Sequence, residues 1–199
     1  MLLSRKAVEQ VNTRERILDA TSRLIYKRGI HDTSLADICF TLKISRGTLY
    51  YYYKTKDKLI TDVLDMHLKS SLSVIRAELE REIMPRGMNE VLDVVPNIFQ
   101  NPSFSSKLHL HLLYEGYFGN KTIIKRFSIF FSELKKILSD KLNEYLGDAE
   151  KADKLAELSI QAGYGKAFLS AVSDIRSFMF DDLQLFTGNR KKKVKTEQI

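Results

Sequence analysis

Three closely spaced lysines, Lys54, Lys56 and Lys58, carry the clearest chemical signal in the sequence. Thr55 is suited to cap a helix, which places Lys56 and Lys58 in the first helical turn. Cations there oppose the positive end of the helix dipole and cost about 0.3–1 kcal/mol each. An external anion reverses this penalty, because free backbone amides and ammonium groups together hold a phosphate. The spacing therefore predicts a phosphate clamp at the start of this helix.

Four consecutive tyrosines, Tyr50 to Tyr53, lie directly before the clamp. An ordinary exposed turn does not carry so many aromatic rings, so some must be buried and some must face a partner. By helical phase Tyr53 joins Leu49 in the core. Tyr50, Tyr51 and Tyr52 can then offer their hydroxyl groups to phosphates or base edges.

Two short helices are predicted to position these side chains. Ser34 and Asp37 have the spacing of a helix N-terminal capping box, and four apolar residues after Ser34 share one face: Leu35, Ile38, Cys39 and Leu42. Ser45 is a suitable N-cap for a second helix, whose buried residue is Leu49. Two helices joined by a tight turn form a helix-turn-helix, whose second helix presents its outer face to the DNA major groove.

The segment SRGTLYYYYKTKDKL, preceded by TSLADI and a turn that ends in Ile44, resembles the DNA-binding signature of the TetR family of bacterial transcriptional regulators. The resemblance covers residues 12–59. It implies an all-α fold with an N-terminal three-helix helix-turn-helix domain and a C-terminal helical bundle for ligand binding and dimerisation. The sequence departs from the family pattern at Leu42 and Lys43, where small residues are usual, and at Tyr52 and Tyr53, where a His-Phe pair is common.

Site residues follow from this motif. We expect base readout by Arg46, Tyr50 and Tyr51. The candidates for phosphate contact are Ser34, Thr48, Tyr52 and Lys56. Gly47 is expected to matter because its missing side chain allows the helix to approach DNA closely.

Charge is distributed as a nucleic-acid-binding protein requires. Residues 1–58 carry a net charge of +6, residues 59–189 carry −3, and the tail 190–199 carries +4, within a chain of 199 residues and net charge +7. We therefore expect a DNA-binding domain over 1–58, an effector-binding and dimerisation domain over 59–189 and a basic tail. The single cysteine, the lack of a long apolar run and the absence of a signal-peptide pattern favour a cytoplasmic protein that does not contact membranes.

Helical patterns continue along the whole chain. A bracing helix is predicted over 12–28, with Asn12 and Glu15 as its capping pair and Gly29 after its end. A long helix is expected from Lys56 to Met84, where Pro85 stops it. Further helices are expected at about 88–100, 103–118, 121–146, 151–172 and 174–187.

The C-terminal part is rich in aromatic residues, which either form an ordinary helical core or line an apolar cavity for a small ligand. Under the second interpretation, the ligand-binding candidates are His111, Tyr114, Glu115, Phe118, Phe127, Phe131, Tyr164 and Phe168. His109 and His111 point about 200° apart on a helix, so they cannot share a metal ion without help. No metal site, cofactor or catalytic constellation is predicted, and the chain is expected not to be an enzyme.

Small residues recur at helical spacing over 151–172, namely Ala152, Ala156, Ser159, Gly163, Ala167 and Ser170. With the helix 174–187 they can form a homodimer interface, or they can pack internally. The sequence thus predicts a ligand-responsive regulator that binds a palindromic operator in double-stranded DNA as a dimer, acts as a repressor and is released by a small apolar or amphipathic effector. The alternative is a regulator that uses the same fold to bind another protein, with little DNA binding.

Overall fold

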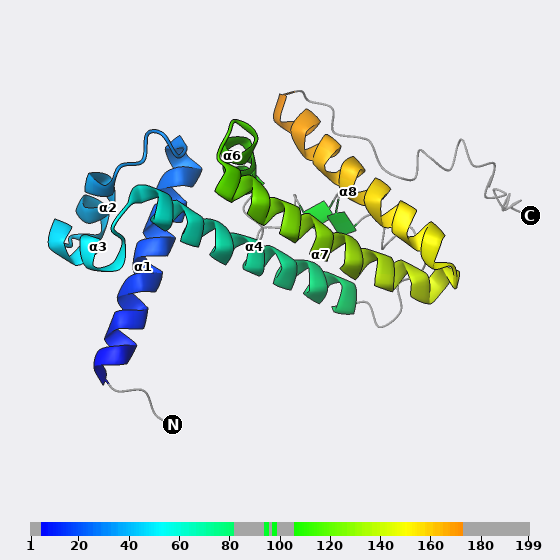
Figure 1. Ribbon diagram of the computed structural model, residues 1–199, viewed down its shortest axis with the longest axis horizontal. Coiled ribbons are helices and arrows are strands. Elements are labelled where there is room, and N and C mark those ends of the chain that lie inside the picture. The colour runs from blue at the N-terminus through cyan, green and yellow to red at the C-terminus, as the bar shows by residue number, and fades with distance from the viewer. Residues whose placement is uncertain (1–4, 82–93, 96, 99–105, 173–199) are drawn as a thin grey trace, which may run out of the picture. The chain divides into compact units, whose positions relative to one another are not determined.

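The computed structural model describes residues 5–81, 94–95, 97–98 and 106–172, and these residues are helical or lie in short connections between helices (Figure 1). The helices are α1 (Arg5–Arg28), α2 (Leu35–Leu42), α3 (Arg46–Tyr52), α4 (Lys56–Arg81), α6 (Ser106–Tyr117), α7 (Lys121–Leu146) and α8 (Ala149–Val172). The described part contains no strand, in agreement with the all-α prediction.

The chain divides into two compact units. The first combines residues 1–77 with 100–134, and the second combines 78–99 with 135–199. The first unit therefore contains the helix-turn-helix together with α6 and the N-terminal half of α7. The division of the chain at 58 and 189 remains a prediction.

The predicted start of the first helix at Asn12 was wrong. α1 begins at Arg5, so Asn12 and Glu15 lie inside the helix and do not cap it. Residues 5–11 contain neither glycine nor proline, and nothing in this stretch interrupts helical hydrogen bonding. The end was predicted correctly, because α1 ends at Arg28 and Gly29 follows with a φ of +85°.

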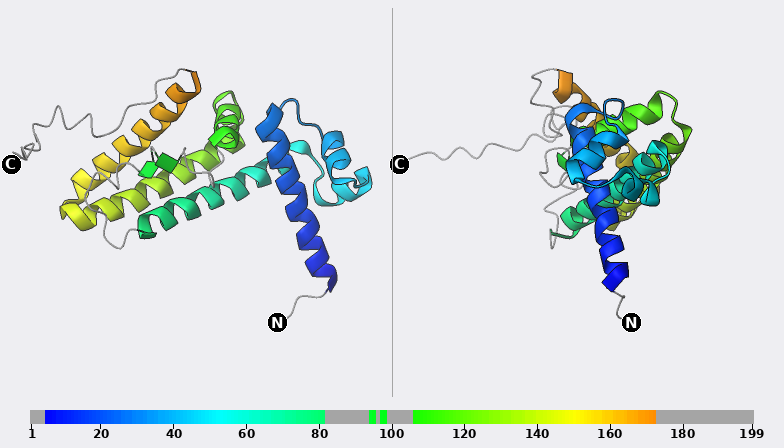
Figure 2. Two further views of the ribbon diagram at one scale, coloured as in Figure 1. Left: turned by 180° about the vertical axis from the view of Figure 1, so that it is seen from behind. Right: turned by 90° about the vertical axis from the view of Figure 1, so that its left-hand side faces the viewer.

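Apolar side chains at helical spacing join α1, α2 and α3 around one core. α1 packs on α2, and α2 packs on α3, as the views in Figure 2 show. The fully buried side chains of this part include Ile17, Ile25, Ile38, Leu49, Tyr53 and Leu59. Burying each of these side chains stabilises the fold by about 1.5–3 kcal/mol.

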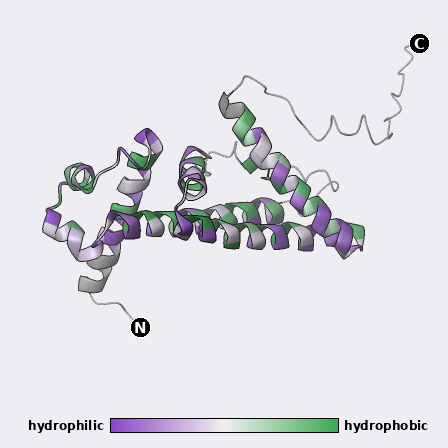
Figure 3. Cartoon of the chain, turned by 45° about the horizontal axis from the view of Figure 1, so that its top comes forward, coloured by the Kyte–Doolittle hydropathy of each residue, from purple (hydrophilic) through white to green (hydrophobic). Residues whose placement is uncertain are grey.

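α4 and α7 are amphipathic, and Figure 3 shows hydrophilic and hydrophobic residues alternating along both helices. In the first unit, α4 buries Leu59, Val63 and Leu64, while α7 buries Ile123 and Phe127. The predicted bounds of α7 agree with the structure, and α6 begins three residues after the predicted start. The expected end of α4 at Met84 and the helix 174–187 lie outside the described residues.

In the second unit, α8 buries the small residues Ala152, Ala156 and Ser159 within the single chain. Leu138 and Leu142 of α7 are also fully buried, and Lys135 of α7 forms ion pairs with Asp153 and Glu157 of α8. These three small side chains therefore serve internal packing, which was one of the two interpretations of the stripe. α8 begins two residues before its predicted start.

Candidate nucleic-acid interface

The N-terminus of α2 is held by the predicted capping box. The Ser34 side chain accepts a hydrogen bond from the Asp37 backbone amide, and the Asp37 carboxylate accepts one from the Ser34 amide at 2.9 Å. Hydrogen bonds from the Ser34 hydroxyl and amide, together with an ion pair to Arg28 at 2.7 Å, lower the pKa of Asp37 to about 2. Ser34 is exposed, so its hydroxyl lies at the surface beside the amides that begin α2.

The turn between α2 and α3 contains a residue with an unusual backbone conformation. Among the described residues other than glycine, it is the one with a positive φ. Lys43 adopts φ 54° and ψ 41°, and its amide donates to carbonyl oxygens at the end of α2. This left-handed conformation favours glycine, which lacks the Cβ that crowds the backbone. The turn thus keeps its compact geometry with lysine in place of a small residue.

Ser45 caps α3 as predicted, and its side chain accepts a hydrogen bond from the Thr48 amide at 3.0 Å. The Ser45 and Thr48 hydroxyl groups lie 2.9 Å apart. Arg46 and Gly47 occupy the first turn of α3 and are both exposed. A Cβ at Gly47 would meet only the Ser45 Oγ, at 3.6 Å, which is ordinary van der Waals contact. Packing within the chain therefore does not require glycine there.

The tyrosine run divides between core and surface as the helical phase predicted. Tyr53 is 1% exposed, whereas Tyr50 is 45% and Tyr51 is 65% exposed. Tyr52 is half-buried, and its ring meets that of Tyr51 edge to face with centroids 5.1 Å apart. Arg46, Tyr50 and Tyr51 thus all present polar groups at the surface of α3.

Lys56 is tied to the turn between α1 and α2, a contact that the sequence did not reveal. Its Nζ donates to the carbonyl oxygen of Ile30 at 2.7 Å and lies 3.4 Å from that of His31. An ammonium group has three donors, so one remains for a phosphate when both carbonyl groups are engaged. Its neighbour Lys54 is exposed, and Lys58 pairs with Asp62 at 2.7 Å.

Asp62 joins three elements of the helix-turn-helix region. Its carboxylate accepts hydrogen bonds from Arg14 of α1 at 2.6 Å, from the Tyr53 hydroxyl at 3.3 Å and from Lys58 at 2.7 Å. Burial alone would raise the pKa of Asp62, but the hydrogen bonds from Lys58 and Arg14 outweigh it and hold the pKa below its ordinary value. Burial also raises the pKa of Tyr53 to about 12. The network fixes where α3 ends and α4 begins.

A second set of contacts joins α1 to α6. Lys107 lies over the Tyr26 ring at 5.3 Å, and the His31 Nε2 lies 3.3 Å from a carboxylate oxygen of Glu115. A Cβ at Gly29 would lie 3.7 Å from the His111 ring. His111 and Glu115, two of the predicted ligand-binding residues, therefore face the turn that follows α1.

The other predicted ligand-binding residues are dispersed. Phe127 is fully buried and Phe131 is half-buried, with ring centroids 6.0 Å apart. Tyr114 and Phe118 stack at 4.3 Å but are 62% and 66% exposed, so they form a surface pair. Tyr164, half-buried, and Phe168, exposed, belong to the second unit. Burial raises the pKa of Tyr164. The ligand-binding role of all eight residues remains a prediction.

Sequence analysis missed a buried pair of histidines. The His67 Nε2 of α4 lies 2.9 Å from the His109 Nδ1 of α6, and Phe127 packs against the His109 ring at 5.1 Å. Burial lowers the pKa of His67 to about 4 and also lowers that of His109, which the neighbouring His67 depresses further. Among the described residues, no group of three or more His, Cys, Asp or Glu side chains is arranged to hold a metal ion.

Two kinds of comparison bear on this arrangement. The sequence model of bacterial regulatory proteins of the tetR family matches residues 17–63, which span the end of α1 through the start of α4. An uncharacterised HTH-type transcriptional regulator from the lacX 3′ region of Lactococcus lactis is 29% identical over 147 residues, 68% of this chain and 71% of that protein. TtgR from Pseudomonas putida is 34% identical over 87 residues, 43% of this chain and 41% of TtgR.

Solved structures show the same fold. A TetR-family regulator from Cytophaga hutchinsonii has a TM-score of 0.74 at 17% identity, covering 94% of each chain. A putative transcriptional regulator from Saccharomonospora viridis, in complex with choline, has a TM-score of 0.65 at 19% identity, covering 89% of this chain and 94% of that one. Residues 17–63 thus have the helix-turn-helix sequence of the tetR family of bacterial regulatory proteins, and the described helices share the fold of TetR-family regulators. The chain's relatives are regulators and not enzymes, as the sequence predicted.

Over the described residues, no helix combines the length and the apolar composition that a membrane crossing needs.

Proposed function

We propose that the protein binds a palindromic operator in double-stranded DNA as a homodimer, with α3 in the major groove. The observation that carries this proposal is the arrangement of polar side chains on and around α3. Arg46, Tyr50 and Tyr51 are exposed on the helix itself, and groups suited to phosphate contact flank it on both sides. Ser34 lies at the start of α2, and Lys56 lies at the start of α4.

Each side chain has a defined role in this proposal. Arg46 and the two exposed tyrosines read base edges, while Thr48, Tyr52, Ser34 and Lys56 hold phosphates. The Asp62 network supports these contacts indirectly, because it joins α1 and α4 at the end of α3. Gly47 lets the backbone of α3 approach the groove closely, which is consistent with the space around it.

An exposed stripe of small and apolar residues on α8 supports the proposal of a dimer on a two-fold operator. Leu158, Ala162, Gly165 and Leu169 recur at helical spacing and are all exposed. A Cβ built at Gly165 would lie in open space. Apart from the backbone of the helix and the two adjacent residues, none of the described residues comes within 4 Å of it. A stripe of small and apolar residues allows a second helix to approach closely, so we assign this face to the two-fold axis.

The proposal also includes regulation by a small ligand. We propose a cytoplasmic repressor that leaves its operator when a small apolar or amphipathic effector binds outside the helix-turn-helix. The chain contributes an open groove in the first unit that has the size of such a ligand.

Selection of bound sequences from a random DNA duplex pool tests this proposal. Enrichment of an inverted repeat with half-sites about one DNA turn apart is expected. If folded protein enriches no sequence at low salt but captures one protein partner in stoichiometric amount, the proposal fails in favour of a protein-binding regulator.

A further inference from the structure

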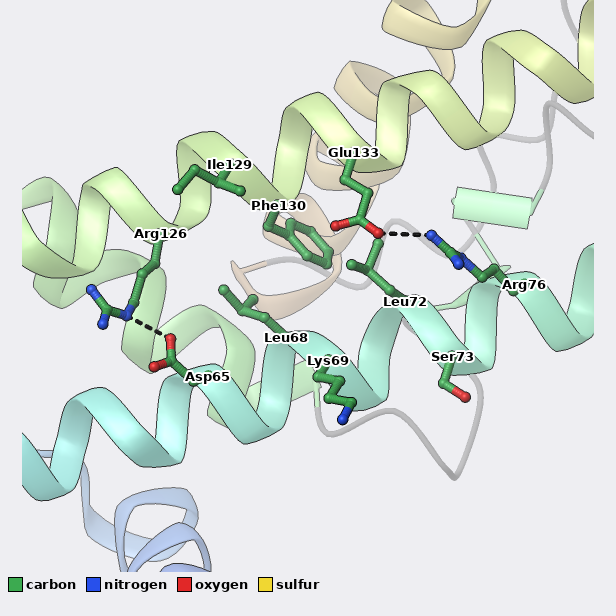
Figure 4. Close-up of a pocket in the computed structure, with 10 residues that line it drawn as sticks. All are labelled: Asp65, Leu68, Lys69, Leu72, Ser73, Arg76, Arg126, Ile129, Phe130 and Glu133. Atoms are coloured by element: carbon green, nitrogen blue, oxygen red, sulfur yellow. Dashed lines mark hydrogen bonds and ion pairs between the residues drawn. The ribbon is translucent and has the colours of Figure 1, made fainter.

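An open groove runs between α4 and α7 within the first unit (Figure 4). Its volume is about 520 Å³, which lies in the range of small-molecule sites. None of the eight ligand-binding residues predicted from the sequence lines it. The groove is therefore a candidate site that neither the motif nor the aromatic pattern pointed to.

Apolar side chains form the base of the groove. Leu68 of α4 is 7% exposed and Phe130 of α7 is 3% exposed, so both belong to the core between the helices. Leu72 is half-buried, and Ile129 is 60% exposed on the α7 side. An apolar molecule in the groove would cover Ile129 and the accessible part of Leu72, and removal of this apolar surface from water favours binding.

Two ion pairs cross the groove. Arg126 pairs with Asp65 at 2.5 Å, and Arg76 pairs with Glu133 at 2.7 Å, as the dashed lines in Figure 4 show. All four side chains are between 32% and 51% exposed. Such solvated pairs contribute little to stability, so either arginine can exchange its carboxylate for that of a ligand at little cost.

A third cation lies between these two pairs along α4. Lys69 lines the groove and is exposed, and its ammonium has no ion pair or hydrogen bond to any of the described residues. The lining thus contains three cations, Lys69, Arg76 and Arg126, against the two carboxylates of Asp65 and Glu133. The excess of one positive charge beside an apolar base complements a molecule with one negative charge.

We propose that this groove binds a small monoanionic amphiphile, a carboxylate with an apolar body. The carboxylate meets Lys69 and one of the two arginines, and the apolar body covers Ile129, Leu72 and Phe130. As a candidate effector, this ligand rests on the function proposed above, but its binding does not depend on DNA. The excess of one positive charge in the lining disfavours a cationic ligand of the same shape.

Calorimetric titration of the full chain with decanoate, below its aggregation concentration, tests the site. Decanol and decyltrimethylammonium have the same chain length with a neutral and a cationic head. We expect one decanoate per chain, bound about ten-fold more tightly than either analogue. Equal affinity for decanoate and decyltrimethylammonium would overturn the assignment of an anion site.

Two substitutions with matched controls locate the binding. Ile129→Glu places a carboxylate at the groove and is expected to weaken decanoate binding about ten-fold, whereas Ile124→Glu, at an exposed position of the same helix outside the groove, should not. Lys69→Glu should weaken binding similarly, and Lys125→Glu should leave it unchanged. Equal effects within either pair would overturn the site.

Operator binding by the same variants separates this proposal from the previous one. If Ile129→Glu protein binds operator DNA like the parent protein but is no longer released by decanoate, both proposals hold. If decanoate binds as described to a protein that selects no DNA sequence, the groove stands and the proposed function fails. If DNA is selected and no decanoate binds, the groove proposal fails alone.

Discussion

The Lys56 Nζ lies 2.7 Å from the carbonyl oxygen of Ile30, 26 residues earlier in the chain. This bond ties the start of α4 to the turn after α1. In the proposed DNA complex the same ammonium also contacts a phosphate, so one side chain has both a structural and a binding role.

Replacing Lys56 with alanine should therefore have two effects. Affinity should fall about equally on all DNA sequences, and the slope of log K against log salt concentration should drop by about 0.9 for one lost phosphate contact. Loss of the bond to Ile30 should also lower the free energy of unfolding by about 1 kcal/mol. Salt titrations and urea unfolding measure the two effects. For the unfolding measurement Lys54→Ala is the control, since it removes an exposed charge without this bond. An unchanged salt slope in Lys56→Ala would refute the phosphate contact.

Arg46→Ala should relax base preference at one position of each half-site, with a loss of about 1–3 kcal/mol in discrimination. The reason is that the exposed Arg46 lies in the first turn of α3, which in the proposed complex enters the major groove first. Binding to single-base operator variants measures the change. Arg23→Ala, which removes an exposed arginine of α1, should leave base preference intact.

Gly47→Ala should affect protein stability and operator affinity in different ways. The chain has room for the methyl group, and alanine favours helix by about 0.5–1 kcal/mol over glycine, so the protein should be as stable or more stable. Operator affinity should nevertheless fall, because in the proposed complex the methyl group would lie between the α3 backbone and the DNA. Thermal unfolding measures the stability and a gel-shift titration measures the operator affinity, both on one preparation. Full affinity in a stable variant would show that α3 does not approach the groove closely at this point.

Lys43→Gly should stabilise the protein by up to about 1 kcal/mol, since glycine adopts the left-handed conformation at this turn without steric cost. Lys43→Ala is the matched control, because it removes the charge and keeps the Cβ. Urea unfolding should rank glycine above both lysine and alanine. If the alanine variant gains as much stability as the glycine variant, charge and not backbone conformation limits this turn.

Acid should weaken the first unit through His67 and His109. Both imidazoles are held neutral in the folded protein, whereas in the unfolded chain they bind protons below about pH 6.5. The unfolded state then binds more protons, so the free energy of unfolding should fall by up to about 1.4 kcal/mol per pH unit for each imidazole as the pH drops from 6.5 toward 4. Urea unfolding across this range measures the slope. His31→Gln, an exposed control, should keep it, and His67→Gln should reduce it.

Local features of the sequence predicted much of the fold. The capping bonds at Ser34 and Ser45 join atoms three residues apart, so the sequence contains all that determines them. Helical phase likewise separated Tyr53 from Tyr50 and Tyr51. The early start of α1 was missed because an N-cap residue was read as a boundary although helix-forming residues precede it.

Contacts between distant residues could not be predicted in this way. Arg14 meets Asp62 across 48 residues, and His67 meets His109 across 42. Neither pair has a characteristic spacing, because packing of α1 and α6 against α4 brings the atoms together. The groove was missed for the same reason: its residues come from two helices that are separate in sequence.

Asp62 and Asp65 lie three residues apart on α4, about 4.5 Å along its axis. The first carboxylate holds Arg14 and Tyr53, and the second holds Arg126 of α7. An α-helix is rigid over three residues, so the two positions move together. In the proposed regulator, a displacement at this end of the groove would therefore reach, within one helical turn, the carboxylate that holds the end of α3, and α4 would be a short mechanical path from effector to DNA.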